Sequence, residues 1–110
     1  MEAPTRPASH PLDPLVSICR LELTDTAAVL HLSGDWRLDA LTRLSGALAQ
    51  CDLARIGPRA VVIEGAALTS LDTAGALLFL RRVVQSGADL ASLQLRGFDA
   101  RHQRIVDVVR

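Results

Sequence analysis

The chain has 110 residues, about the length of one domain, and 49% of them are hydrophobic, which is enough for a single core. Its 12 basic residues, all of them Arg, balance 12 acidic ones, so the charge does not indicate a nucleic acid or an anionic membrane as partner. No run of about 18–20 apolar residues is present, so we expect no membrane insertion by this segment.

The first 14 residues are rich in Pro and small polar side chains. This composition predicts a disordered leader and does not resemble a signal peptide. The remaining chain, residues 15–110, carries the periodic patterns of regular structure, and we expect it to form one domain.

The first half of the domain predicts a hairpin followed by a helix. Residues 15–23 and 27–32 are short apolar runs separated by Thr-Asp-Thr, which indicates two strands joined by a tight turn. From Asp39 onward, apolar residues recur at steps of three and four, which predicts a helix with Asp39 as its N-cap. Gly57 and the proline after it end this helix.

The second half alternates between strand and helix. Residues 59–64 are β-branched and apolar on both faces, which is typical of a central strand covered on both sides. A loop over residues 65–70 leads to a helix over residues 73–86, then to a strand over residues 90–95 and a last helix after residues 97–99. The order β-β-α-β-α-β-α predicts an α/β fold with a mixed sheet flanked by α-helices.

Motifs of catalysis and of cofactor binding are missing from the sequence. A nucleotide-binding loop of the G-x-x-x-x-G-K-[ST] type needs a lysine, and the chain has none. The three histidines are scattered: His10 lies in the leader, His31 is expected on the solvent side of a strand, and His102 on the polar side of the last helix. We therefore expect no catalytic residues, no metal site and no cofactor, and we do not expect an enzyme.

The two cysteines, Cys19 and Cys51, belong to no C-x-x-C or His/Cys cluster. Both lie in apolar-periodic segments, so we expect reduced thiols that pack as small hydrophobic side chains. A disulfide between them is the alternative.

The start of the helix predicted over residues 73–86 is the most informative segment. Its first turn has unpaired backbone N–H groups and the positive end of the helix dipole. Asp72 or Thr73 could cap these N–H groups, and the same turn would also stabilise a phosphate on the Thr73 hydroxyl. Capping and phosphorylation both remain open.

The same helix is expected to have two faces. The side predicted to enter the core comprises Thr73, Leu77, Leu80 and Val84, with Ala76 and Val83 beside them. The side predicted to face outward comprises Ala74, Leu78, Arg81, Arg82 and Gln85. Arg next to exposed apolar side chains is typical of a protein contact surface, and a solvated face with one stray Leu is the alternative. Leu78→Asp and Arg82→Glu are then expected to leave the fold intact.

Three sequence segments resemble one known family. V-V-I-E-G-A-A-L-T-S-L-D-T-A-G-A-L-L, over residues 61–78, resembles the signature of STAS domains. L-H-L-S-G-D-W-R-L, over residues 30–38, and G-F-D-A-R-H-Q-R-I-V-D-V-V, over residues 97–109, resemble the STAS region at the N-terminus of Mla-type lipid-transport ABC permeases. The resemblance covers residues 15–110.

This resemblance implies a non-catalytic module without a cofactor, at the cytoplasmic face of a bacterial inner membrane. Such a module docks on the transporter's ATPase subunit, and the natural chain could continue into a membrane permease. Asp72, Thr73 and the outward helix face would form that contact.

The alternative is a stand-alone STAS protein, such as an anti-sigma-factor antagonist phosphorylated at Thr73. Thr73 stands where the antagonists have Ser, and Glu64 stands where they usually have Asp. Both departures favour docking over phosphorylation.

Overall fold

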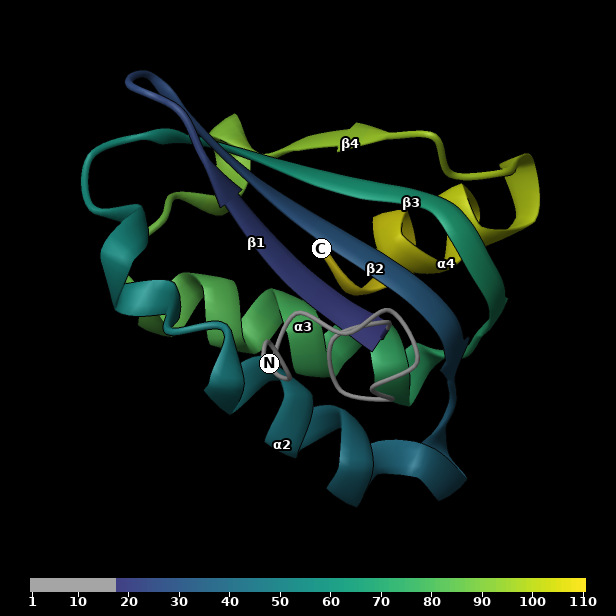
Figure 1. Cartoon of the computed structure of the whole chain (residues 1–110). Helices are drawn as coiled ribbons and strands as arrows, with labels where there is room; N and C mark the ends of the chain where they lie inside the picture. Colours follow the sequence, from purple (N-terminus) through teal and green to yellow (C-terminus); the bar gives the residue numbers. More distant parts are fainter. Residues whose placement is uncertain (1–17) are drawn as a thin grey trace, which may run out of the picture.

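The computed structural model describes residues 18–110, which form a four-stranded mixed sheet packed against the helices α2, α3 and α4 (Figure 1). The strands and α-helices follow one another in the predicted order β-β-α-β-α-β-α, which confirms the α/β fold class. The predicted leader, residues 1–14, lies outside the described residues. Within residues 18–110, no helix combines the length and the hydropathy that crossing a bilayer requires.

The strands lie in the sheet in the order in which they follow along the chain, β1-β2-β3-β4. β1 is antiparallel to β2 in the predicted hairpin, whereas β3 is parallel to both β2 and β4. The strands are β1 (Cys19–Leu23), β2 (Ala27–Trp36), β3 (Ala60–Leu71) and β4 (Gln94–Arg96). The helices are α2 (Leu41–Gln50), α3 (Thr73–Gln85) and α4 (Ala100–Val109), and the short 3-10 helices are η2 (Leu38–Ala40), η3 (Leu53–Ile56) and η4 (Leu90–Ser92).

Three local predictions were wrong. The segment 65–70 is not a loop, because β3 continues to pair with β2 as far as Trp36 and Leu71, with two irregularities in register. Asp39 lies inside η2 and does not cap α2, which begins after Ala40 without a side-chain cap. Half of the strand predicted at 90–95 is the turn η4, which the Asp89 carboxylate caps by accepting a hydrogen bond from Ala91, and the strand β4 begins only at Gln94.

The helices cover one face of the sheet, and the core lies between the two layers (Figure 1). Strand residues alternate between the two faces, so Val61 and Ile63 enter the core while Val62 and Glu64 lie on the other side. Within residues 18–110 no helix covers that other side, where Val62 and Glu64 are half-buried. β3 is therefore an inner strand as predicted, but the described helices cover it on one side only.

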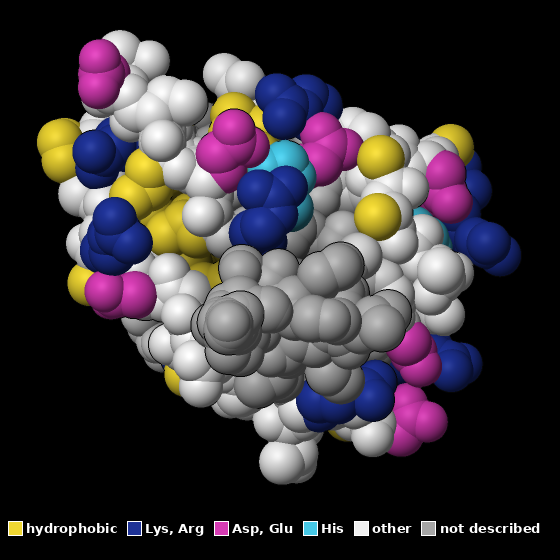
Figure 2. All heavy atoms as spheres, in the orientation of Figure 1, with side chains coloured by type: hydrophobic (Ala, Val, Ile, Leu, Met, Phe, Trp, Pro, Cys, Tyr) yellow, Lys and Arg dark blue, Asp and Glu magenta, His cyan; other side chains and the backbone are white. Residues whose placement is uncertain are grey.

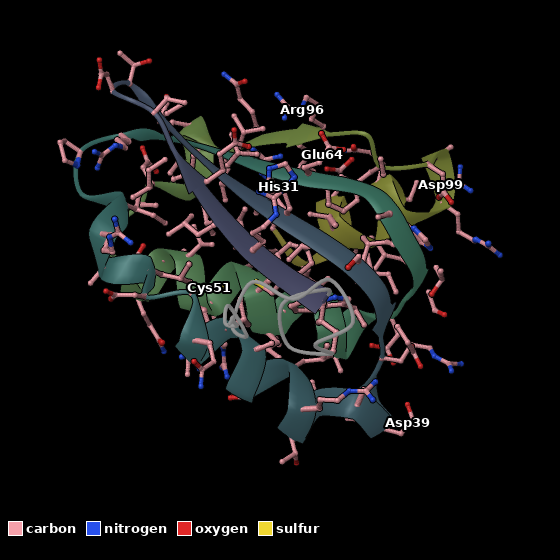
Figure 3. All side chains as sticks on the ribbon, viewed as in Figure 1. His31, Asp39, Cys51, Glu64, Arg96 and Asp99 are labelled. Atoms are coloured by element: carbon pink, nitrogen blue, oxygen red, sulfur yellow. The ribbon has the colours of Figure 1, made fainter. Side chains whose placement is uncertain are left out.

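The face of the sheet that the described helices leave uncovered has charged side chains on neighbouring strands (Figures 2 and 3). The Nε2 atom of His31 lies 2.8 Å from Glu22 Oε1, and the Nε of Arg96 donates to Glu64 Oε1 over 2.6 Å. The hydrogen bond from His31 lowers the pKa of Glu22, and that from Arg96 lowers the pKa of Glu64. His31 thus lies on the solvent side of its strand, as predicted.

His102 does not follow the prediction. Its side chain is buried on the core side of α4, with only 4% of the residue exposed. Its backbone N–H donates to the Asp99 carboxylate over 2.8 Å, which caps α4, and its Nδ1 lies 3.6 Å from the same carboxylate. Because Asp99 caps α4, His102 lies in the first turn of the helix, and its imidazole is buried there.

Candidate protein-interaction site

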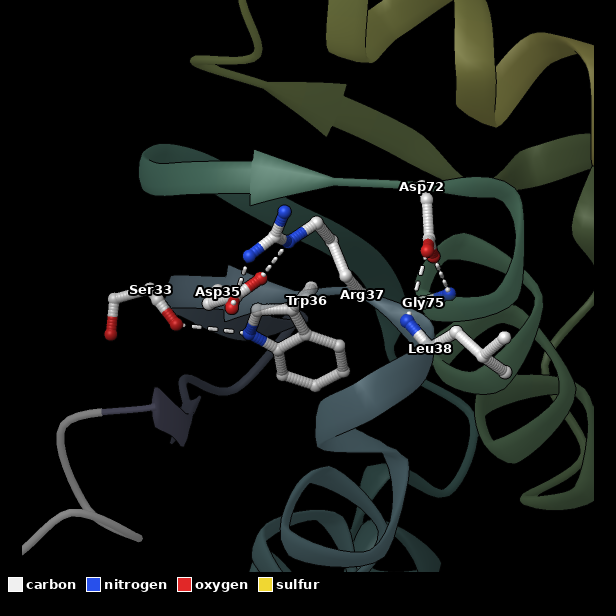
Figure 4. Close-up of polar contacts among 7 residues, drawn as sticks. All are labelled: Ser33, Asp35, Trp36, Arg37, Leu38, Asp72 and Gly75. Carbon is white, nitrogen blue, oxygen red and sulfur yellow. Dashed lines mark hydrogen bonds and ion pairs between the residues drawn. The ribbon is translucent and has the colours of Figure 1, made fainter.

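The Asp72 side chain joins two helical elements at one edge of the sheet (Figure 4). Because β2 and β3 are parallel, their carboxyl ends meet there, and Trp36 pairs with Leu71. One Asp72 carboxylate oxygen accepts a hydrogen bond from the backbone of Gly75 in α3, and the other accepts one from Leu38 in η2, each over 2.9 Å. Asp72 is therefore the N-cap of α3 as predicted, and it also holds η2 against α3.

The end of β2 lies directly against the first turn of α3. The Trp36 carbonyl oxygen accepts a hydrogen bond from the Asp72 N–H over 3.2 Å and lies so close to Gly75 that a Cβ atom there would overlap it. The Trp36 indole is fully buried, donates to the Ser33 carbonyl over 2.9 Å, and meets the ring of Phe79 edge-on at a centroid distance of 5.8 Å. These contacts decide which side of α3 faces the core.

That side differs from the prediction. The buried residues of α3 are Gly75, Ala76, Phe79, Leu80 and Val83. Thr73, Leu77 and Val84, which we expected in the core, are exposed instead. The helix has apolar residues of its own on most of its sides, so its periodicity allows more than one rotation about its axis. The helix has one glycine, Gly75, and one aromatic residue, Phe79, and both lie on the buried side. These two residues could have indicated the correct rotation of the helix.

The exposed side chains of α3 lie along one side of the helix, and we call them the α3 surface: Thr73, Leu77, Arg81, Val84 and Gln85. Of the residues predicted on the outward side, only Arg81 and Gln85 are exposed.

The remaining predicted site residues have structural contacts of their own. Ala74, Leu78 and Arg82 are half-buried. Leu78 packs against the core, and Arg82 donates to the Ser45 hydroxyl of α2 over 3.4 Å. The Asp72 carboxylate uses both oxygens for backbone hydrogen bonds. The structure therefore divides the predicted site residues into two sets: Thr73, Arg81 and Gln85 are exposed, whereas Asp72, Ala74, Leu78 and Arg82 are half-buried.

A groove of about 270 Å³ runs along the α3 surface toward α4. It is lined by Leu77, Leu80, Arg81, Val84, Gln85, Leu90 and Val109, and none of these is acidic. Leu77 and Val84 are 39% and 42% exposed, respectively. A groove lined by apolar side chains and an arginine is typical of a surface that binds another protein.

Leu38 is a further exposed apolar residue, and it lies near the start of α3. Its side chain is 64% exposed, and its backbone N–H reaches Asp72, so it lies beside the first turn of the helix. We did not predict Leu38, because in sequence it is a single Leu between Arg37 and Asp39. Only its position next to α3 connects it to the site.

An ion pair lies next to this edge of the sheet (Figure 4). The Arg37 guanidinium makes two hydrogen bonds to the Asp35 carboxylate, over 2.7 and 3.0 Å. This contact lowers the pKa of Asp35 and raises that of Arg37. Both side chains are solvent-accessible, so the pair adds little stability.

Residues 18–110 hold no cluster of three or more His, Cys, Asp or Glu side chains that could bind a metal ion.

Comparison with protein-family models gave no match, and no curated protein sequence matched the chain. The molecule is thus defined by its small α/β fold with a four-stranded mixed sheet, and by an apolar groove on one helix.

The close approach of α3 to β2 predicts opposite effects for two helical glycines. Gly75→Ala should lower the free energy of unfolding by about 2 kcal/mol or more, because the new methyl group overlaps the Trp36 carbonyl. Gly46→Ala is the control, since Gly46 is exposed on α2 and a methyl group added there would meet no atom within 4 Å; it should raise stability by up to about 1 kcal/mol. Urea unfolding measures both, and equal effects would contradict the close approach.

The corrected face of α3 predicts a contrast between two neighbouring leucines. Leu78→Asp should lower the free energy of unfolding by about 1–3 kcal/mol, because it buries part of a carboxylate against the core. Leu77→Asp should change it by less than about 1 kcal/mol, because this side chain is exposed. The reverse order in thermal or urea unfolding would show that α3 is rotated as its periodicity alone indicates.

Proposed function

We propose that this chain is a non-catalytic protein-interaction module of the STAS type, which docks through its α3 surface on the ATPase subunit of a bacterial lipid-transport ABC system. The observation that carries the proposal is the position of the exposed apolar side chains. Leu38, Leu77 and Val84 lie along or beside one helix, and Leu77 and Val84 border an apolar groove that also contains Arg81. Arginine is enriched among the residues that dominate protein interfaces, and exposed apolar side chains that border a groove mark a surface suited to binding a partner.

The resemblance to STAS domains supports the choice of partner. The Asp-Thr-Ala-Gly segment begins α3, and the segment L-H-L-S-G-D-W-R-L ends at Leu38. Both segments meet at the Asp72 carboxylate, so a segment that resembles STAS domains in general and one that resembles the transporter branch lie together at the start of α3. The ATPase subunit, the cytoplasmic membrane face and a continuation into a membrane permease follow from this resemblance and are part of the proposal.

A second candidate function is that of an anti-sigma-factor antagonist phosphorylated at Thr73. One observation favours it: Thr73 is exposed in the first turn of α3, while Asp72 provides the cap. The Thr73 hydroxyl is therefore not needed as the cap, and the helix dipole would stabilise a phosphate there.

Docking predicts that Leu77→Asp weakens binding to the ATPase subunit of an Mla-type transporter from the same genome at least tenfold. The reason is that a charge replaces an apolar contact inside the interface. Arg81→Glu should weaken it as well, because it reverses the one charge that lines the groove. Isothermal titration calorimetry with the purified ATPase subunit measures both affinities.

Val108→Asp is the matched control for this experiment. Val108 is 82% exposed on α4 and does not line the groove. The Val108→Asp variant should therefore bind the ATPase subunit with the affinity of the unchanged protein. If Leu77→Asp and Val108→Asp bind equally well, the α3 surface is not the docking site. If the unchanged protein does not bind, the ATPase subunit is not its partner.

Partner switching predicts a phosphate on Thr73 after incubation with ATP and an anti-sigma kinase. Peptide mass spectrometry locates the phosphate, and Thr73→Ala should abolish it. Thr69, which is exposed on β3, is an internal control within the same region and should stay unmodified. An unchanged mass would rule out this second function for the kinase used.

A further inference from the structure

The two cysteines lie side by side, although they are 32 residues apart in sequence. Cys19 is the first residue of β1, and Cys51 directly follows α2. Their Sγ atoms are 3.1 Å apart, and both thiols are free. Figure 3 labels Cys51 at the end of α2, on the side of the helix that faces the sheet.

The two thiols differ in exposure. Cys19 is buried, with 4% of the residue exposed, whereas Cys51 is half-buried and is the more accessible of the two. A reagent in solution therefore reaches the Cys51 sulphur first, and the Cys19 sulphur lies within 3.1 Å to react with whatever forms there. This is the arrangement of an attacking cysteine and a resolving cysteine.

The pKa shifts of the two thiols agree with these roles. A hydrogen bond with Cys19 lowers the pKa of Cys51, and the backbone of Leu21 contributes in the same direction. The hydrogen bond with Cys51 and burial raise the pKa of Cys19. Because a thiolate is the nucleophile in thiol–disulfide exchange, the more accessible sulphur is also the more reactive one.

We propose that Cys19 and Cys51 form a redox-sensitive pair that closes to a disulfide when the chain meets a small-molecule disulfide such as oxidised glutathione. The Cys51 thiolate attacks one glutathione sulphur, which forms a mixed disulfide and releases one glutathione thiolate. Cys19 then loses its proton to solvent and attacks the Cys51 sulphur, which releases the second glutathione. Two protein thiols are oxidised and one glutathione disulfide is reduced to two thiols, so electrons and protons balance.

The bond joins the start of the edge strand β1 to the end of α2. Both sulphurs already lie in contact, so closure needs only a small shift of the side chains. The cross-link is separate from the α3 surface, since neither cysteine lines the groove between α3 and α4. The proposal therefore does not depend on the identity of any docking partner.

The test uses the folded chain in glutathione buffers of increasing oxidised fraction, with free thiols alkylated before intact mass spectrometry. We expect a species that has lost two hydrogens, carries no alkyl group, returns to the reduced form with dithiothreitol, and melts on the order of 10 °C higher than that form. Cys19→Ser should accumulate a glutathione adduct on Cys51. Cys51→Ser should stay unmodified while folded, because Cys19 is buried.

Three outcomes would overturn the proposal. They are a stable glutathione adduct on the unchanged protein, no reaction in excess oxidised glutathione, or a disulfide that forms only in denaturant. Far-ultraviolet circular dichroism on each serine variant separates loss of reactivity from loss of fold.

Discussion

The Asp72 carboxylate is the contact on which the rest of the site depends. With two hydrogen bonds it provides the N-cap of α3 and holds the start of η2, and so it ties together the chain segments that leave two parallel strands. A carboxylate that accepts backbone N–H groups at a helix start also lies at the positive end of the helix dipole, which stabilises its charge. This one side chain thus determines where α3 begins and where Leu38 lies.

The rotation of α3 follows from its contact with β2. Gly75 allows the helix to approach the Trp36 carbonyl, and Phe79 meets the Trp36 ring one turn later. With these two residues directed at the sheet, Leu77 and Val84 must lie outside, beside Arg81. The exposed apolar surface is therefore a direct consequence of how the core packs, and the apolar groove is the space left between α3 and α4.

The two faces of the sheet have different roles. The face toward the helices is apolar and forms the core, whereas the other face holds hydrogen-bonded polar side chains on neighbouring strands. Glu64 shows why the acid at this position is compatible with a strand: Arg96 on β4 and the Ala66 N–H satisfy its carboxylate. The charged face, the α3 surface and the cysteine pair occupy separate parts of the molecule.

The order of the elements, the hairpin, the inner position of β3 and the cap at Asp72 could all be predicted from the sequence. Each depends on periodicity, turn residues or a cap, and these act over a few neighbouring residues. The length of β3 could not be predicted, because residues 65–70 are held in a strand by pairing with β2 and not by their own preference. The sequence analysis also missed the turn that Asp89 caps at residues 90–92 and the burial of His102 on α4.

Only the tertiary structure decided which face of α3 is exposed and which distant residues meet. A helix with apolar residues on most sides has no unique rotation until a partner surface selects one, and the carbonyl and ring of Trp36 made that selection here. The proximity of Cys19 and Cys51, like that of Leu38 and Asp72, arises from the packing of segments far apart in the chain. Local sequence contains no signal for such contacts, because their energy is realised only when the layers assemble.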